Sequence, residues 1–182
     1  MDRRGSGHGD WEGGGRAMKR RRWALLGAVC LIAIACAMSC SRSEGAGLAK
    51  DQADAYFLVF EDIFELDDEL NSDIEFIAID TNDMKISDTK QLITLLQGFC
   101  DSHGFTLLQD DFDGLVDKKY IENQYFKEGI LVKFNDSALG QDSLETMASK
   151  WRSALGMIGA EYKVEKADGK WEITNTFIRM KS

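Results

Sequence analysis

A run of positive charge followed by a run of apolar residues divides this chain of 182 residues into two parts. One lysine and three arginines stand at 19–22, and residues 23–38 after them are uncharged and mostly apolar. The cations cross a bilayer only at high cost, so they stay in the cytoplasm and orient the segment while the apolar run inserts. This layout is typical of a bacterial export signal. It predicts a signal peptide or membrane segment over 18–39, separate from the folded core.

The export segment ends at Ala37-Met38-Ser39-Cys40, where a small residue precedes a cysteine. These four residues resemble the lipobox of bacterial lipoproteins. The resemblance implies that Cys40 receives a diacylglyceryl thioether and becomes the mature N-terminus. Two acyl chains suffice for stable anchoring, because each buried methylene contributes roughly 0.8 kcal/mol. We therefore expect a lipid-anchored protein at the bacterial cell membrane, with its domain facing the outside.

Two other outcomes of export stay open. Ala33-x-Ala35 and Ala35-x-Ala37 are small-x-small sites for ordinary cleavage, which would release a soluble protein. Alternatively the segment stays uncleaved, because residues 23–41 are nineteen residues without a charge, about the length that spans a bilayer. All three outcomes place residues 45–182 outside the cytoplasm.

The remaining segments have clear compositional signatures. Residues 1–17 are glycine-rich and polar, with no apolar periodicity from which a core could form. We expect either a short disordered cytoplasmic tail or a start-site artefact, with translation beginning at Met18. Residues 40–50 are small and polar and are predicted to be a lipidated tether. Residues 51–182 are predicted to form a single extracytoplasmic domain.

The exported part is strongly acidic. Residues 40–182 carry 15 cationic and 28 acidic side chains, a net charge of −13. This charge aids solubility, and it argues against binding of nucleic acid or another polyanion. Beyond Cys40 the only cysteine is Cys100, so no intramolecular disulfide is available there. Its place at the end of an apolar helical pattern indicates a small buried residue.

The first half of the domain combines helices and strands. Apolar residues recur at helical spacing from Leu48 to Leu66 while acids fill the other face, which predicts a long amphipathic helix. Phe76–Asp80 is typical of a buried strand. An apolar helix then ends at His103-Gly104, and Phe105–Gln109 is predicted to be a second strand. These segments predict a β-α-β unit.

The second half indicates an antiparallel sheet. A short helix is predicted at 112–120, followed by alternating segments at 129–136, 144–153 and 161–166. Asp168-Gly169 is a strong hairpin signal, and the return strand contains Trp171, Ile173 and Phe177. An N-terminal helix, a β-α-β segment and a C-terminal antiparallel meander predict an α+β fold. The layout resembles the curved sheet wrapped on a helix of the cystatin and NTF2 folds.

Carboxylates cluster after the first strand and again near residue 110. Asp80, Asp83 and Asp88 are candidates to bind a hard cation or to do acid–base work, although turns and helix caps explain the last two equally well. The stretch 110–114 has the beginning of a calcium loop. With Gln109 as the first position and Gly114 as the sixth, the twelfth is Tyr120, where a bidentate glutamate is needed, and this favours a surface turn.

Motifs for common chemistries are missing from the sequence. His103 is the only histidine beyond Cys40, which leaves little room for a zinc site. There is no phosphate-binding loop, dinucleotide fingerprint or serine-nucleophile motif. We expect no cofactor, and we expect a role other than catalysis.

The most distinctive segment is 150–159. Strand alternation sends Lys150 and Arg152 to one face and Trp151 to the other. The two cations are candidates to hold an anionic ligand, with Trp151 and Tyr162 lining an apolar groove. The simpler alternative is a core tryptophan with an outward charged face and glycines at a bulge or turn.

The same run, Trp-Arg-Ser-x-Leu-Gly-x-Ile-Gly, is followed by Asp-Gly-Lys-Trp-Glu-Ile-Thr. These motifs resemble those of small uncharacterised lipoproteins of Gram-positive bacteria, over most of residues 50–182. The resemblance implies an extracytoplasmic domain and indicates no mechanism.

The sequence thus predicts a lipid-anchored, monomeric α+β domain that acts by binding. Its ligand site is expected in the concavity between the sheet and a helix, near Trp151, Arg152 and Tyr162. One alternative is a metal-dependent enzyme that uses the carboxylates around Asp80. Another is a protein-interaction or immunity module at the cell surface, for which an exposed apolar patch on the sheet would be the sign.

Overall fold

Residues 47–182 are described by the structure, which is a computed structural model. The predictions for residues 1–17, for the export segment at 18–39 and for lipidation of Cys40 therefore lie outside the described residues. Within the described range, no helix is long and apolar enough to cross a membrane.

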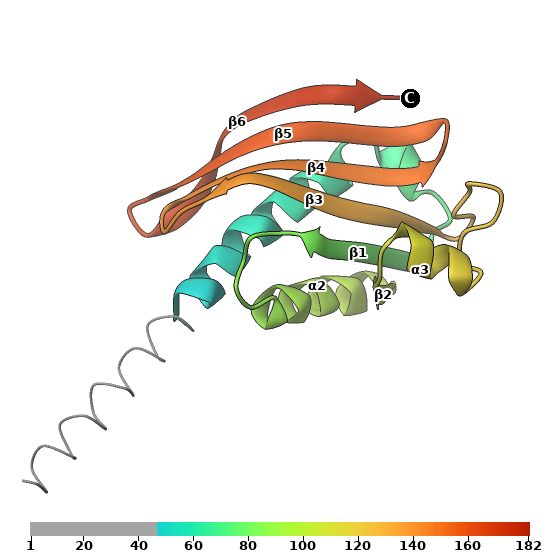
Figure 1. The fold of residues 1–182 in the computed structure, drawn as a ribbon, viewed down its shortest axis with the longest axis horizontal. Coiled ribbons are helices and arrows are strands. Elements are labelled where there is room, and N and C mark those ends of the chain that lie inside the picture. Colours follow the sequence, from blue (N-terminus) through green and yellow to red (C-terminus); the bar gives the residue numbers. More distant parts are fainter. Residues whose placement is uncertain (1–46) are drawn as a thin grey trace, which may run out of the picture. The chain divides into compact units, whose positions relative to one another are not determined.

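One long helix packs across the sheet. Residues 47–65 are helical (Figure 1, cyan), and we call this element the long helix. Its apolar residues share one face because of their three- and four-residue spacing. Those that are 0% exposed are Ala53, Ala55, Tyr56, Val59, Phe60 and Ile63. Residues 47–50, assigned to the tether from sequence, are already helical, and Ala49 is buried. A 3-10 helix, η1 (Asp68–Asn71), follows.

The β-α-β segment is confirmed. Strand β1 (Phe76–Asp83) runs parallel to β2 (Thr106–Gln109), and helix α2 (Lys90–His103) connects them. Gly104 ends α2 in the left-handed conformation, at φ 79°, which glycine adopts without steric cost.

The antiparallel meander is also confirmed. A short helix, α3 (Phe112–Asp117), precedes four long strands. These are β3 (Gly129–Leu139), β4 (Ser143–Ser153), β5 (Gly156–Ala167) and β6 (Lys170–Lys181). In the turn between β5 and β6, Asp168 and Gly169 have φ values of 52° and 78°, as the Asp-Gly pair predicts. The α+β class and its three predicted parts are therefore present.

All six strands belong to one mixed sheet, in the order β2-β1-β3-β4-β5-β6. The β-α-β unit joins the meander through a parallel pairing of β1 with β3, in which Phe76 lies opposite Gly129. No local pattern in the sequence indicates this pairing, because the two strands are far apart along the chain.

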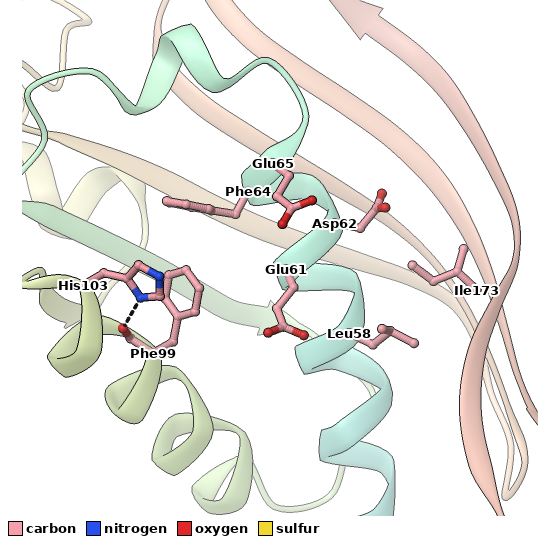
Figure 2. A pocket seen from close by; sticks show the side chains of 8 residues that line it. All are labelled: Leu58, Glu61, Asp62, Phe64, Glu65, Phe99, His103 and Ile173. Atoms are coloured by element: carbon pink, nitrogen blue, oxygen red, sulfur yellow. Dashed lines mark hydrogen bonds between the residues drawn. The ribbon is translucent and has the colours of Figure 1, made fainter.

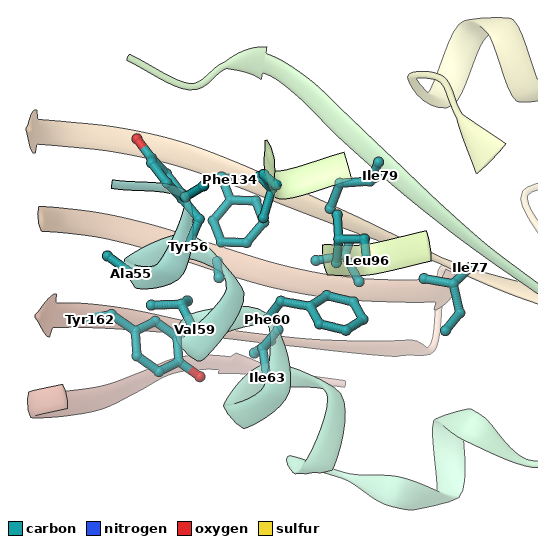
Figure 3. Packing of buried hydrophobic residues seen from close by; sticks show 14 of the residues in the cluster. Ala55, Tyr56, Val59, Phe60, Ile63, Ile77, Ile79, Leu96, Phe134 and Tyr162 are labelled. Atoms are coloured by element: carbon teal, nitrogen blue, oxygen red, sulfur yellow. The ribbon is translucent and has the colours of Figure 1, made fainter. Parts of the chain in front are cut away.

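The sheet separates two clusters of buried side chains. Ile77 and Val132 face the long helix and α2, whereas Ala78 and Leu131 point to the other face, as period-two alternation requires. Figure 3 shows the larger cluster, in which Phe60 and its neighbours pack on the sheet. The smaller cluster lies beneath α3 and the residues that follow it.

Candidate functional site

A groove runs along the long helix, beside α2 and β6. Two adjoining pockets of 380 and 410 Å³ form it, and Leu58 and Glu61 line both. The first pocket (Figure 2) is completed by Asp62, Phe64, Glu65, Phe99, His103 and Ile173. The second is completed by Asp51, Asp54, Phe57, Gly169, Lys170 and Trp171. We call the two together the acidic groove, because five of their residues are carboxylates.

Aromatic rings form one wall of the acidic groove. The rings of Phe64 and Phe99 meet edge to face at 5.1 Å, and His103 stacks on Phe99 at 4.2 Å. The His103 Nδ1–H donates to the Phe99 carbonyl over 2.8 Å (Figure 2), because a carbonyl can only accept. This bond fixes the orientation of the ring. The wall therefore offers aromatic faces to a ligand.

Carboxylates line the helical side of the groove. Residues 51–75 contain ten acids and no lysine or arginine. Glu61 and Glu65 are exposed one turn apart, and across residues 47–182 neither forms an ion pair. Like charges at this spacing destabilise a helix by about 0.2–0.5 kcal/mol. A cation bound between the two carboxylates would remove that repulsion.

The other end of the groove is fixed by polar contacts with the β5–β6 hairpin. Lys166 forms an ion pair with Asp51 at 2.5 Å, and the Trp171 Nε1–H donates to the Asp51 carbonyl over 2.8 Å. Partial burial and then the Asp51 carboxylate raise the pKa of Asp54. These contacts hold the hairpin against the long helix, so this end of the acidic groove is formed without a ligand.

Lys150, a predicted ligand residue, is 0% exposed and lies behind the groove. Its ammonium donates to the carbonyls of Phe64 and Asp67 over 2.7 and 3.2 Å, and to Asn71 Oδ1 over 3.0 Å. Burial lowers the pKa of Lys150 to about 8. The C-terminal end of a helix favours a cation, and here the neighbouring side chains are acids. Lys150 therefore stabilises the helix end and is not exposed to a ligand.

Arg152, the second predicted cation, also binds backbone carbonyls. Its Nη1 donates to Leu70 and Ser72 over 3.0 and 2.6 Å, and its Nη2 donates to Lys127 over 2.8 Å. Alternation was thus a correct guide to the face, since Lys150 and Arg152 both point toward the segment after the long helix. It could not indicate that protein carbonyls would occupy both cations.

Trp151 and Tyr162 lie on opposite sides of the sheet. Trp151 is partly buried, packs against the smaller buried cluster and meets Phe112 edge to face at 5.1 Å. Tyr162 faces the long helix, and its hydroxyl donates to Asp62 over 2.8 Å. Burial and the Asp62 carboxylate raise the pKa of Tyr162 above its ordinary range. The four predicted residues therefore do not line one site, although Lys150 and Tyr162 support the groove from behind.

The predicted metal carboxylates do not converge. Lys133 lies 3.5 Å from Asp80 and 2.8 Å from Asp83, so one lysine joins these two. Asp88 instead accepts the Lys90 backbone N–H over 3.0 Å at the start of α2. No group of three or more histidine, cysteine or acidic residues in the described part of the chain is arranged to hold a metal ion.

The interpretation of Cys100 from sequence is confirmed, whereas that of 110–114 is corrected. Cys100 is fully buried, and burial raises the pKa of its thiol to about 11, so it is no nucleophile at neutral pH. The stretch 110–114 is a helix start and not the surface turn favoured from sequence, because Asp111 caps α3 by accepting the Gly114 N–H over 2.9 Å.

The acidic groove was missed from sequence because Phe99, His103 and Ile173 come from elements whose packing no local pattern indicates. The one signal for this groove in the sequence is the stretch 51–75, which contains ten acids and no lysine or arginine. Searches found no family model, no curated protein and no solved structure that matches the chain.

Proposed function

We propose that this protein is a lipid-anchored extracytoplasmic binding domain, without catalytic activity, whose acidic groove holds a cationic and partly apolar ligand. The observation that carries the proposal is the position of Glu61 and Glu65, which face the aromatic wall of Phe64, Phe99 and His103 without an ion-pair partner within residues 47–182. The ligand class that fits best is a basic amphipathic peptide.

The chemistry of the groove favours such a peptide over a bare metal ion. A lysine or arginine side chain placed over an aromatic ring at an exposed site stabilises binding by about 0.5–1 kcal/mol. Exposed carboxylates add about 0.2–1 kcal/mol each. Leu58 and Ile173 offer apolar surface beside these charges. Because each contact is weak, affinity requires several of them, as a peptide that follows the groove would supply.

The location rests on the export segment. The lipobox-like ending at Cys40 supports anchoring by lipid at the bacterial cell membrane, with the domain outside. The domain has a net negative charge, and a membrane with anionic lipids is also negatively charged. The membrane surface therefore repels the domain. A groove that attracts cations would then be open to basic ligands outside the cell.

Calorimetry of the full chain in non-ionic detergent tests the proposal. The probes are an amphipathic lysine–leucine peptide, its glutamate–leucine counterpart and spermine. We expect the lysine peptide to bind, and we expect Glu61→Gln/Glu65→Gln to weaken it about tenfold. The matched control is Glu69→Gln/Glu145→Gln, which makes the same charge change outside the groove and should stay within about twofold. Equal effects of the two double variants, or preference for the acidic peptide, would refute the proposal.

A further inference from the structure

Methionine side chains gather on the face of the sheet that points away from the long helix. Residues 47–182 contain four methionines. Three of them lie on this face of neighbouring strands (Figure 1): Met147 on β4, Met157 on β5 and Met180 on β6. All three are partly exposed, and we call them the methionine cluster. The fourth, Met84, packs against the larger buried cluster on the other side of the sheet.

The strand register brings the methionine cluster together around Gly159 on β5. Met180 lies directly opposite Gly159. Met147 lies opposite Glu161, which places it diagonally across from Gly159. Met157 comes two residues before Gly159 and therefore points to the same face. Diagonal neighbours on one face of a sheet are within reach of long side chains.

Glycine at position 159 leaves a space into which the methionines extend. A Cβ placed on Gly159 would lie 2.8 Å from the Met180 methyl carbon and 3.3 Å from the Met147 methyl carbon. Both side chains therefore reach the same point over the bare backbone of β5. Methionine has three rotatable bonds and a polarizable sulfur, so these side chains can turn their sulfurs toward one ion.

The surroundings of the methionine cluster suit a cation. Lys133, Lys163 and Arg179 lie on the same face, and each forms an ion pair with a carboxylate. The exported part of the chain has a net charge of −13, which raises the local concentration of cations. Trp151, opposite Met157, adds apolar surface, and apolar surroundings limit the access of water to a metal ion.

We propose that the methionine cluster binds a soft monovalent metal ion, Cu(I) or its analogue Ag(I). Thioether sulfur is a soft ligand that selects such ions, whereas calcium and magnesium require oxygen ligands. Met147 and Met180 would be the main ligands, and Met157 would add a third sulfur. The site is independent of the acidic groove, because the two share no residue and lie on opposite faces of the sheet.

A silver titration followed by NMR tests this site. The full chain, labelled with carbon-13 in its methionine methyl groups, is kept in non-ionic detergent and chloride-free buffer. Its exposed thiols are first blocked with N-ethylmaleimide. We expect Ag(I) to shift the methyl signals of Met147 and Met180 and to leave that of Met84 in place. Sodium at the same concentration should shift none of them.

Conservative variants test which side chains hold the ion, with affinity for Ag(I) measured by calorimetry. Met147→Leu/Met180→Leu keeps the side-chain volume and removes two sulfurs, so it should weaken binding at least about tenfold. Met84→Leu is the matched control and should stay within about twofold. Cys100→Ala should also keep the affinity, because the Cys100 thiol is buried on the other side of the sheet.

Three results would overturn the proposal. They are the absence of a shift at Met147 and Met180 with excess Ag(I), equal losses of affinity in the double variant and in Met84→Leu, and loss of binding in Cys100→Ala. Cu(I) in a reducing buffer, measured by competition with a chromophoric chelator, should rank the variants in the same order as Ag(I).

Discussion

Lys150 is the residue on which the end of the long helix depends. Its ammonium is fully buried and donates to the Phe64 and Asp67 carbonyls and to Asn71. Helix ends leave carbonyls without partners, and the acids around this end give the helix dipole no compensation. The strand pattern predicted that Lys150 and Arg152 share one face of the sheet, and it left open an outward charged face, which the burial of Lys150 contradicts. Its partners could not be predicted, because they come from a segment more than seventy residues earlier in the chain.

Replacing Lys150 with methionine should destabilise the domain by about 2–4 kcal/mol, because three partly buried acceptors lose their donor. Urea unfolding at neutral pH measures this change. Lys163→Met, at an exposed site, should change the free energy of unfolding by no more than about 0.5 kcal/mol. A Lys150→Met protein as stable as wild type would show that the ammonium contributes nothing to the helix end.

The difference in free energy of unfolding between wild type and Lys150→Met should depend on pH. The pKa of Lys150 is lowered to about 8 in the folded state, against about 10.4 when unfolded. Between these values the unfolded state binds more protons, so stability rises with pH. We expect the stability of wild type relative to Lys150→Met to increase from about pH 8 to about pH 10. A flat or falling difference would contradict the burial of a charged amine.

At the scale of elements, two tyrosine–carboxylate bonds fix the long helix on the sheet. Tyr56 on the helix donates to Asp136 on β3, and Tyr162 on β5 donates to Asp62 on the helix. Burial and the partner carboxylates raise the pKa of both tyrosines above the ordinary range. Their contribution to stability is therefore present below about pH 10 and is lost at more alkaline pH.

Removing each hydroxyl should reveal which bond matters more. Tyr56→Phe should cost about 1–3 kcal/mol, because Asp136 is only 7% exposed and keeps just the Lys85 N–H as a donor. Tyr162→Phe should cost less, because water can solvate the half-buried Asp62. Urea unfolding of the two variants checks the ranking, and the reverse order would contradict it.

Elements were predictable where their signals are local. Helical spacing, the Gly104 cap and the Asp168-Gly169 turn all indicated structure within a few residues, and the structure contains each of them. The parallel pairing of β1 with β3 depends on contacts distant in sequence. The acidic groove depends on the same kind of contact, so only its acidic helix face was visible in the sequence.

At the scale of the whole molecule, negative charge is concentrated along one segment. Residues 51–75 contain ten acids and no lysine or arginine, and five of those acids line the acidic groove. Residues 40–182 as a whole carry a net charge of −13. A basic ligand would therefore be attracted to the whole domain and most strongly to this segment.

Anchoring is a prediction at the same scale. Wild type and Cys40→Ala expressed in a Gram-positive host are compared by fractionation and intact mass. We expect wild type at the membrane with a lipid-modified N-terminal Cys40, and we expect the variant to lose this modification. An unprocessed membrane-bound product in both strains would instead indicate an uncleaved anchor.

The most direct test of the account is hydrogen–deuterium exchange of the full chain with and without the amphipathic lysine–leucine peptide. Binding in the acidic groove predicts slower exchange in the C-terminal part of the long helix, residues 58–65, and at the end of α2, residues 99–103. It predicts no change at residues 118–128. Slower exchange at 118–128, or none in the groove at saturating peptide, would contradict the central claim.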